Sequence, residues 1–202
     1  TNSNNLCLSG GVALNCVANG KILNDKTFED IWIQPASGDA GGALGGALAV
    51  WHKELNKPRT VNPKDSMKGS YLGPMYKQGS IEKRLLDCCA KFDSVTEDEI
   101  IEQISQALAD GKAIGWFQGR MEFGPRALGN RSILGDPRSE KMQKTLNLKV
   151  KYRESFRPFA PSVLREDVTE WFELDYDTPY MLLVGDVRKD KRIEMTKEEE
   201  SL

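Results

Sequence analysis

Residues 5–42 read NLCLSGGVALNCVANGKILNDKTFEDIWIQPASGDAGG. Two short apolar runs in this stretch each end at small residues, Gly10-Gly11 and Ser37-Gly38, and a helical pattern follows each turn. The pattern predicts strands over 5–9 and 30–33 and helices over 12–23 and 41–51. Strand, glycine turn and helix, repeated once, is typical of an α/β unit whose turns face a ligand. The predicted fold class is therefore α/β, or α+β if the later residues form a separate mixed sheet.

The rest of the chain alternates helical and strand patterns after a proline-containing linker. Thr96 begins a well-marked helix, since its hydroxyl precedes Glu97, Asp98 and Glu99 and a face carrying Ile100 and Ile101 inward. Further helices are predicted over 80–90, 139–146 and 166–172, and strands over 113–117, 132–134, 159–164 and 180–184. The predicted division is a first domain over 1–57, a linker over 58–76, a second domain over 77–190 and a charged tail over 191–202.

The composition is that of a globular protein. The chain has 202 residues, 39% hydrophobic and 29% charged, with a formal net charge of −2. Apolar runs are shorter than the ~18 residues that span a bilayer, and no signal peptide is recognisable, so we expect a cytoplasmic protein that does not bind a membrane. Because the chain starts with Thr and opens almost directly on a strand, we expect a piece of a longer protein. The four cysteines lack metal-ligand spacing and are expected to be reduced thiols.

Residues 119–138 read GRMEFGPRALGNRSILGDPR, and we call them the arginine stretch. Four arginines stand among four glycines, which let a backbone approach a ligand closely, and guanidinium groups match phosphate and carboxylate oxygens. Residues 112–157 contain eleven Lys or Arg and four Asp or Glu. A basic island in an acidic chain favours a compact anionic ligand over a nucleic acid. The alternative is a solvated basic face paired with surface acids.

A second basic segment, residues 146–161, reads LNLKVKYRESFRPFAP. If the segment is extended, alternate residues share one face, which would carry Lys151, Arg153 and Arg157. Its aromatic residues could stack a base, or they could form a core cluster with basic neighbours around it. These aromatic residues are Tyr152, Phe156 and Phe159.

The two glycine turns have both ligand-binding and structural interpretations. Backbone N–H groups at Gly10-Gly11 and the following helix start suit a phosphate, but a plain tight turn explains the pair equally well. Asn15 could contact a ribose or base, or be solvated. Asp39 could reach a metal ion or a phosphate-bound cation, although spacing alone favours a helix N-cap. His52 is the only histidine and is expected to be structural or exposed.

Four segments resemble the O-carbamoyltransferases of nodulation-factor and antibiotic biosynthesis, in the same order along the chain. These segments are 8–16, 35–45, 119–134 and 147–161. The resemblance runs from about Leu6 to Val184 and implies the carboxyl-terminal portion of such an enzyme. Residues 1–57 resemble the end of a sugar-kinase/actin-type domain, and residues 77–190 resemble a YrdC-like domain.

The resemblance implies an ATP-dependent reaction. A YrdC-like domain makes carbamoyl adenylate from carbamoyl phosphate and ATP, and the other domain passes the carbamoyl group to a hydroxyl-bearing small-molecule acceptor beside an iron or other divalent metal. The implied catalytic and carbamoyl-phosphate-binding residues are Lys112, Arg120, Arg126, Arg131, Ser132, Asn147, Lys151, Arg153 and Arg157. The implied nucleotide-binding residues are Gly10, Gly11, Asn15, Gly38, Gly41 and Gly42.

Asp39 matches a metal-ligating aspartate of that family, whose histidine partners are expected upstream and are absent here. We therefore expect a partial metal site, no bound metal and no complete carbamoyl transfer from this piece alone. Two alternatives come from other classes: an RNA-binding module related to transfer-RNA threonylcarbamoylation, and a catalytically silent interaction domain. The net charge of −2 disfavours nucleic acid as a partner. Neither the acceptor nor the oligomeric state follows from the sequence.

Overall fold

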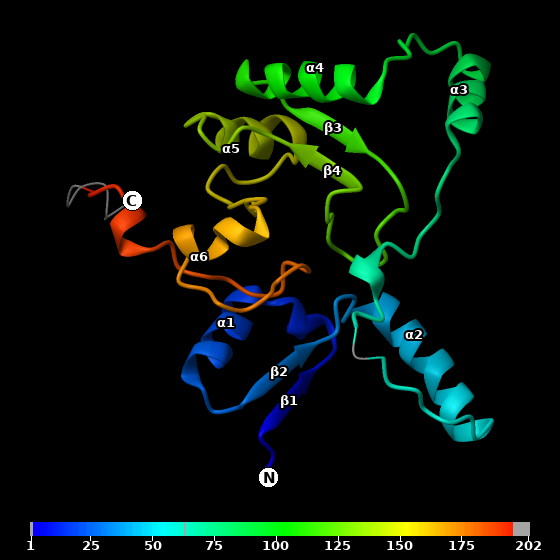
Figure 1. The fold of residues 1–202 in the computed structure, drawn as a ribbon, viewed down its shortest axis with the longest axis vertical. Helices are drawn as coiled ribbons and strands as arrows, with labels where there is room; N and C mark the ends of the chain where they lie inside the picture. The colour runs from blue at the N-terminus through cyan, green and yellow to red at the C-terminus, as the bar shows by residue number, and fades with distance from the viewer. Residues whose placement is uncertain (1, 63, 196–202) are drawn as a thin grey trace.

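The computed structural model describes residues 2–62 and 64–195, and its mixed α/β architecture confirms the predicted fold class (Figure 1). The strands are β1 (Asn5–Leu8), β2 (Asp30–Ile33), β3 (Ile114–Phe117) and β4 (Arg131–Leu134). The helices are α1 (Cys16–Asp25), α2 (Asp39–Ala49), α3 (Gln78–Asp87), α4 (Glu97–Ala109), α5 (Met142–Thr145) and α6 (Val168–Trp171). Short 3-10 or π-helical turns are Gly11–Leu14, Val50–Glu54, Lys68–Ser70, Leu146–Val150, Arg165–Asp167 and Lys189–Lys191.

The first sheet brings the two glycine turns together. β1 and β2 pair in parallel, with Leu8 opposite Ile33, and α1 connects them. Because the carboxyl ends of parallel strands lie at the same edge of a sheet, the segments that come after Leu8 and Ile33 meet there. The Gly10 N–H donates a hydrogen bond to the Ser37 carbonyl at 2.8 Å. The predicted strands over 5–9 and 30–33 are confirmed.

The second sheet is an antiparallel hairpin next to α4 (Figure 1). β3 and β4 pair with Phe117 opposite Arg131. Thr96 starts α4 as predicted: its hydroxyl accepts from the Glu99 N–H at 3.3 Å, and the Glu99 carboxylate accepts from the Thr96 N–H at 2.8 Å. The two strands are joined by residues 118–130, which we call the hairpin loop and which contain the first part of the arginine stretch.

The C-terminal segment returns to the first sheet (Figure 1). The Tyr176 hydroxyl donates to the Ile31 carbonyl of β2 at 3.3 Å. The Asn19 side-chain amide of α1 donates to the Leu182 carbonyl at 2.9 Å. Residues 176–184, which fall in the predicted second domain, therefore pack against α1 and β2 of the first.

Two predicted strands, over 159–164 and 180–184, are wrong. Pro161 has no N–H to donate to a neighbouring strand, which weakens the first as a ladder member. In the second, the Leu182 carbonyl is bonded by the Asn19 side chain rather than by another strand. Both segments are irregular, although each is apolar enough to resemble a strand in sequence.

Several faces predicted to be buried are only partly covered. The Gly- and Ala-rich sequence of residues 41–51 predicts a tightly packed helix. In α2, which the structure describes in full, Gly41 alone is buried, so this prediction is wrong. The pattern of α4 places Ile101 inward, and the apolar run 113–117 predicts a buried strand. Both predictions are wrong, because Ile101 is 54% exposed and Phe117 is 56% exposed. The buried hydrophobic residues among those described are Ala13, Ile31, Ala36, Met142, Leu146 and Leu182. Periodicity shows which residues share a face, but it does not show what packs against that face.

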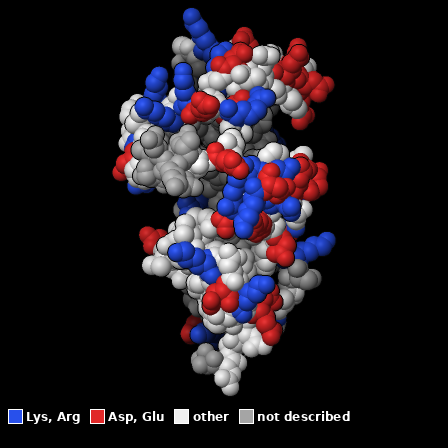
Figure 2. Space-filling model, turned by 90° about the vertical axis from the view of Figure 1, so that its left-hand side faces the viewer, with Lys and Arg blue, Asp and Glu red and all other residues white. Residues whose placement is uncertain are grey.

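Charges of both signs are interspersed over the face drawn in Figure 2. One arginine of the arginine stretch and one of the second basic segment are paired with acids: Arg138 lies 2.8 Å from Asp136, and Arg157 lies 3.0 Å from Glu154. All four cysteines are free thiols. In the part of the chain that the structure describes, no helix is both long and apolar enough to cross a bilayer.

Candidate functional site

The first glycine turn is open to a ligand. A Cβ placed on Gly10, Gly11, Gly38 or Gly42 would meet no atom within 4 Å, so the space in front of these backbones is free. Gly10 has a φ of +99°, a conformation that L side chains rarely adopt. Gly41 differs from these glycines, because a Cβ there would lie 2.2 Å from the carbonyl oxygen of the preceding turn. Packing alone therefore explains Gly41, whereas the other four glycines leave room for an anion.

Asn15 has a structural role that accounts for its side-chain oxygen. It is the N-cap of α1, and its Oδ1 accepts a hydrogen bond from the Ala18 N–H at 3.1 Å. This bond stabilises the helix that leads out of the first turn. Contact between Asn15 and a nucleotide stays a prediction.

The second glycine turn leads into the amino end of α2. The prediction by spacing that Asp39 is the N-cap is wrong: Gly38 takes that position, and Asp39 is the first residue of the helix. No side chain caps this helix. Ser37, the residue before the N-cap, is 2% exposed, and its Oγ has no hydrogen-bond partner among the described residues. An uncapped helix start beside an unpartnered hydroxyl offers N–H groups and the helix dipole to an anion, in competition with the Asp39 carboxylate of the first turn.

Glu122 holds the hairpin loop in shape and is not among the residues predicted from the sequence. Its Oε1 accepts hydrogen bonds from three backbone N–H groups, those of Leu128 at 2.7 Å, Asn130 at 2.8 Å and Arg131 at 3.2 Å. The residue is 6% exposed. Burial alone would raise the pKa of Glu122, but the three N–H donors outweigh it and hold the pKa below its usual value. A single acid within the hairpin loop, among arginines, was the available signal.

Other side chains of the hairpin bond its backbone. The Asn130 amide donates to the Arg120 carbonyl at 2.7 Å, and the Gln118 amide donates to the Gly129 carbonyl at 3.0 Å. The Ser132 hydroxyl, a predicted site residue, accepts from the Gly129 N–H at 2.9 Å. In this structure Ser132 is therefore a residue that positions the loop.

The arginines of the hairpin bond different parts of the backbone. Arg131 donates to the carbonyls of Gln118 at 2.5 Å and Gly119 at 3.3 Å. Arg120 donates to the Gly73 carbonyl at 3.1 Å, which ties the linker to the loop. Each guanidinium has five N–H donors, so these bonds leave donors for an anion.

The tip of the hairpin loop rests on both glycine turns. Gly124 has a φ of +122°, and a Cβ there would lie 3.0 Å from the Ala36 Cβ. The Arg126 Nη2 donates to the Leu14 carbonyl at 2.9 Å, while its Nε is buried with no partner among the described residues. We call the meeting point of these segments the junction; it consists of Leu14, Ala36, Ser37, Gly124 and Arg126. Residues far apart in the sequence are thus brought to one place at the carboxyl edge of the first sheet.

The second basic segment is not extended, so the condition under which its cations would share one face is not met. Residues Leu146–Val150 form a π-helical turn, and Tyr152 has a φ of +50°. Asn147 is fully buried and organises the residues after this turn: its amide donates to the Arg157 carbonyl at 2.8 Å, and its Oδ1 accepts from Arg153 Nε at 2.6 Å. Asn147 and Arg153 are therefore brought together in the structure.

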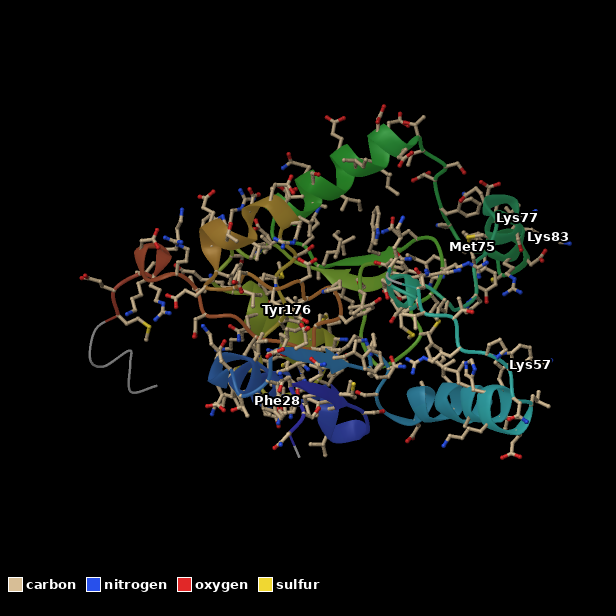
Figure 3. All side chains as sticks on the ribbon, turned by 60° about the horizontal axis from the view of Figure 1, so that its bottom comes forward. Phe28, Lys57, Met75, Lys77, Lys83 and Tyr176 are labelled. Atoms are coloured by element: carbon tan, nitrogen blue, oxygen red, sulfur yellow. The ribbon has the colours of Figure 1, made fainter. Side chains whose placement is uncertain are left out.

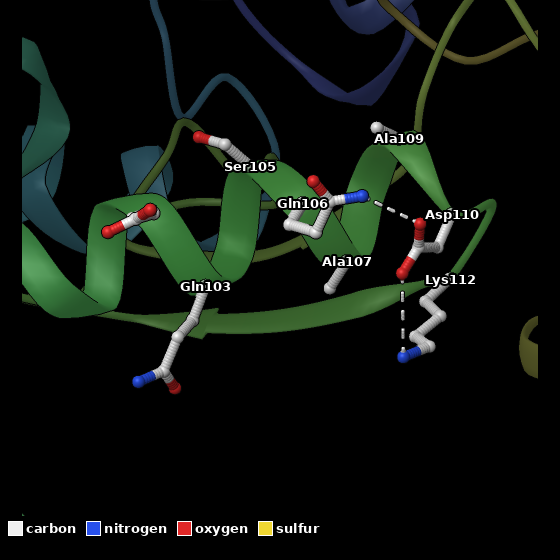
Figure 4. Close-up of a pocket in the computed structure, with 8 residues that line it drawn as sticks. Gln103, Ser105, Gln106, Ala107, Ala109, Asp110 and Lys112 are labelled. Carbon is white, nitrogen blue, oxygen red and sulfur yellow. Dashed lines mark hydrogen bonds and ion pairs between the residues drawn. The ribbon is translucent and has the colours of Figure 1, made fainter.

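Lys112 lies apart from these residues, in the wall of an open cavity of about 610 Å³ along the C-terminal half of α4 (Figure 4). Its ammonium group is 4.0 Å from Asp110 Oδ2, and Glu102 lines the same cavity. An anion in this cavity would meet these two carboxylates as well as Lys112. The cavity therefore suits a phosphate poorly.

Asp39 has no metal-binding partners in the part of the chain that the structure describes. Within residues 2–62 and 64–195, no three His, Cys, Asp or Glu side chains lie close enough together to hold a metal ion. The Nδ1 of His52 is 2.9 Å from the Lys57 carbonyl oxygen. These residues do not fit a metal ion by themselves.

Comparison with known proteins matches both ends of the chain. The family model of the carbamoyltransferase N-terminus matches residues 1–48, and that of the carbamoyltransferase C-terminus matches residues 105–198. An uncharacterized protein of Synechocystis, sll1178, is 57% identical over 98% of this chain and 32% of its own length. Nodulation protein NolO of Bradyrhizobium diazoefficiens is 47% identical over 95% of this chain and 35% of its own length. The 3'-hydroxymethylcephem-O-carbamoyltransferase of Streptomyces clavuligerus is 34% identical over 93% of this chain and 33% of its own length. The chain therefore spans about a third of the length of these relatives.

Proposed function

Because this chain belongs to the carbamoyltransferase family, we propose that it is the carboxyl-terminal part of an ATP-dependent O-carbamoyltransferase. In the proposed reaction, water hydrolyses carbamoyl phosphate to carbamate and phosphate. A carbamate oxygen then bonds the α-phosphorus of ATP, which gives carbamoyl adenylate and releases pyrophosphate. The hydroxyl oxygen of a small-molecule acceptor then bonds the carbamoyl carbon, and AMP leaves. This chain supplies groups that bind phosphate and the carbamoyl moiety, and we expect it to bind these ligands without completing the transfer on its own.

The observation that carries the proposal is the pair of buried, unpartnered polar groups at the junction. Ser37 Oγ and Arg126 Nε are both buried, and neither has a hydrogen-bond partner among the described residues. Leaving such a group unpaired costs about 1–3 kcal/mol, so native proteins rarely keep one without a reason. An anion bound at the amino end of α2 would accept from both groups.

The four open glycines support the same location for a phosphate. A Cβ on Gly11 or Gly38 would meet no atom within 4 Å, and their N–H groups would donate to the phosphate. The Gly10 and Gly42 N–H groups already donate to the carbonyls of Ser37 and Gly38, so these two glycines contribute space alone. Arg126 extends over the first turn from the hairpin loop and donates to Leu14. The Arg126 guanidinium and the N–H groups of the two turns would then stabilise the negative charge on the phosphate as its bond breaks. Enzymes usually promote phosphoryl chemistry by stabilising that charge.

The remaining predicted residues divide into two proposed roles. Arg120, Arg131, Arg153 and Arg157 would present their unused N–H donors to carbamoyl phosphate and ATP, with Lys151 adding charge. Lys112 is given no role in phosphate binding, because Glu102 and Asp110 line its cavity. Ser132 and Asn147 would act as positioning residues, since their hydrogen bonds go to the backbone or to Arg153. Asp39 is proposed to contribute to metal binding only together with residues of a longer chain, and no step of the reaction is assigned to a metal here.

Calorimetry with carbamoyl phosphate, and separately with a non-hydrolysable ATP analogue, tests the proposal on this chain. Arg126→Ala should raise the Kd at least about tenfold, because a hydrogen bond to a charged group is worth about 1.5–3 kcal/mol. The matched control is Arg165→Ala, which removes a surface arginine paired with Asp177 at 2.5 Å and should leave both Kd values unchanged. The assignment would be contradicted if the folded chain binds neither ligand. It would also be contradicted if Arg126→Ala binds both ligands as tightly as the unaltered chain does.

A further inference from the structure

Two aromatic rings lie against each other on the outer side of the hairpin. The ring centroids of Tyr76 and Phe117 are 6.5 Å apart, with planes tilted by 31°. Tyr76 is 41% exposed and Phe117 is 56% exposed. Neither residue belongs to the junction or to the residues assigned above. Other aromatic rings of the chain are as exposed, Trp51 at 50% and Phe156 at 76% among them, so the feature that sets Tyr76 and Phe117 apart is their contact with each other.

Each ring also carries a guanidinium group. The Arg131 Cζ lies 3.4 Å from the Phe117 ring centroid, and the Arg84 Cζ of α3 lies 5.3 Å from the Tyr76 ring centroid. Arg131 is held in place by its bonds to Gln118 and Gly119, so the cation over Phe117 is fixed by the hairpin itself. We call Arg84, Tyr76, Phe117 and Arg131 the stacking platform.

Lys77 and Lys83 are the sequence neighbours of Tyr76 and Arg84, and α3 also carries the acids Glu82 and Asp87. Figure 3 shows Lys77 and Lys83 at α3 with Met75 close by, and all three are exposed. An apolar protein partner would cover two guanidinium groups without giving them acceptors, which is costly. A planar aromatic ligand that carries negative charge satisfies both parts of the surface, since its ring can stack and its anionic group can accept from guanidinium N–H donors.

We propose that the stacking platform binds the base of a purine nucleotide and that Arg131 directs its phosphates toward the hairpin loop. The inference rests on the proposed function, because it gives the ATP of that reaction a position for its base. Arg131 connects the two regions: it lies over the Phe117 ring and donates to the hairpin loop at Gln118 and Gly119. A nucleotide on the platform would therefore have its phosphates beside the arginines of that loop.

The test compares ATP with inorganic triphosphate, which has the charge but no base, by calorimetry on the full chain. Base–aromatic stacking predicts that Phe117→Leu raises the Kd for ATP by about 5- to 150-fold while the Kd for triphosphate stays the same. Tyr76→Leu should act in the same direction. The matched control is Trp51→Leu, since Trp51 is 50% exposed and also has a cation, Lys57, 5.8 Å from its ring, yet it should leave both Kd values unchanged.

The outcomes separate a failure of the stacking platform from a failure of the proposed carbamoyl transfer. ATP that binds no more tightly than triphosphate, or an equal loss of ATP affinity in Trp51→Leu, overturns the platform. The platform is also overturned, in favour of a polynucleotide site, if a short single-stranded RNA binds more tightly than ATP and its affinity falls with salt as steeply as contacts to several phosphates require. If ATP binding depends on Phe117 but carbamoyl phosphate does not bind, the platform stands and the proposed carbamoyl transfer falls. Circular dichroism of each variant separates lost binding from lost folding.

Discussion

Replacing Glu122 should loosen the hairpin loop that carries Arg126. All three hydrogen bonds of this carboxylate end on Oε1, and they come from the N–H groups of Leu128, Asn130 and Arg131. Glu122→Ala leaves three N–H groups without an acceptor, at about 1 kcal/mol each, so the free energy of unfolding should fall by about 3 kcal/mol. Glu122→Gln keeps an oxygen at that place and loses only the charge, so it should cost about 1 kcal/mol.

Urea unfolding at pH 7 measures both free energies, with an unchanged m-value as the sign that the same structure unfolds. Glu154→Gln is the matched control, because that acid is exposed and forms a surface ion pair with Arg157, and the change in the free energy of unfolding should be less than about 1 kcal/mol. Equal costs for Glu122→Ala and Glu154→Gln would refute the reasoning. So would a Glu122→Gln variant as unstable as Glu122→Ala.

The pH dependence of the same variants gives an independent check. The three backbone donors hold the pKa of Glu122 below its usual value despite burial, which acts to raise it. A carboxyl group with a depressed folded-state pKa contributes all its stability above its unfolded pKa, about 4.3, and loses it as the pH falls through the folded value. The difference in unfolding free energy between the unaltered chain and Glu122→Gln should therefore shrink in acid. A difference that stays constant from pH 7 to pH 3 would contradict this.

Three further substitutions test single features of the fold, each by urea unfolding. Gly41→Ala should lower the free energy of unfolding by at least about 2 kcal/mol, because the new Cβ would lie 2.2 Å from a carbonyl oxygen. Gly45→Ala, in open space on the same helix, should raise it by about 0.5–1 kcal/mol. The reverse order would contradict the packing of α2. Thr96→Ala should cost about 1 kcal/mol by removing the capping box, and no change would mean that α4 does not depend on it. Tyr180→Phe removes the donor to Asp65 and should cost about 1–2 kcal/mol. Burial first, and the Asp65 carboxylate second, raise the pKa of Tyr180, so stability should decline as the pH rises above about 10, and absorbance should show this phenol still protonated there.

Local signals in the sequence predicted the local structure well. Small residues after short apolar runs, Gly10-Gly11 and Ser37-Gly38, predicted β1, β2 and their turns. The φ freedom and small size that a tight turn needs are properties of those residues alone. Thr96 followed by acids predicted the start of α4 for the same reason, because a capping box involves residues only three apart.

Features that depend on distant contacts were missed or wrong. The contact of Gly124 with Ala36 joins the hairpin tip to the second glycine turn, and no local pattern announces it. Glu122 looked like one acid in a basic stretch, and its burial follows only from the closure of the hairpin loop around it. Ile101 lies on an apolar face of α4, but whether that face is covered depends on other elements.

Nuclear magnetic resonance on the ¹⁵N-labelled chain tests most directly whether the junction is a single anion site. Carbamoyl phosphate is titrated while the backbone amide signals of Gly10, Gly38 and Gly124 are followed, with Gly111, at the far end of α4, as the reference. The account predicts that the first three signals shift together with one Kd, that Gly111 does not move, and that Arg126→Ala abolishes the shifts. Shifts confined to one turn, or a response at the hairpin tip with no response at either turn, would contradict it.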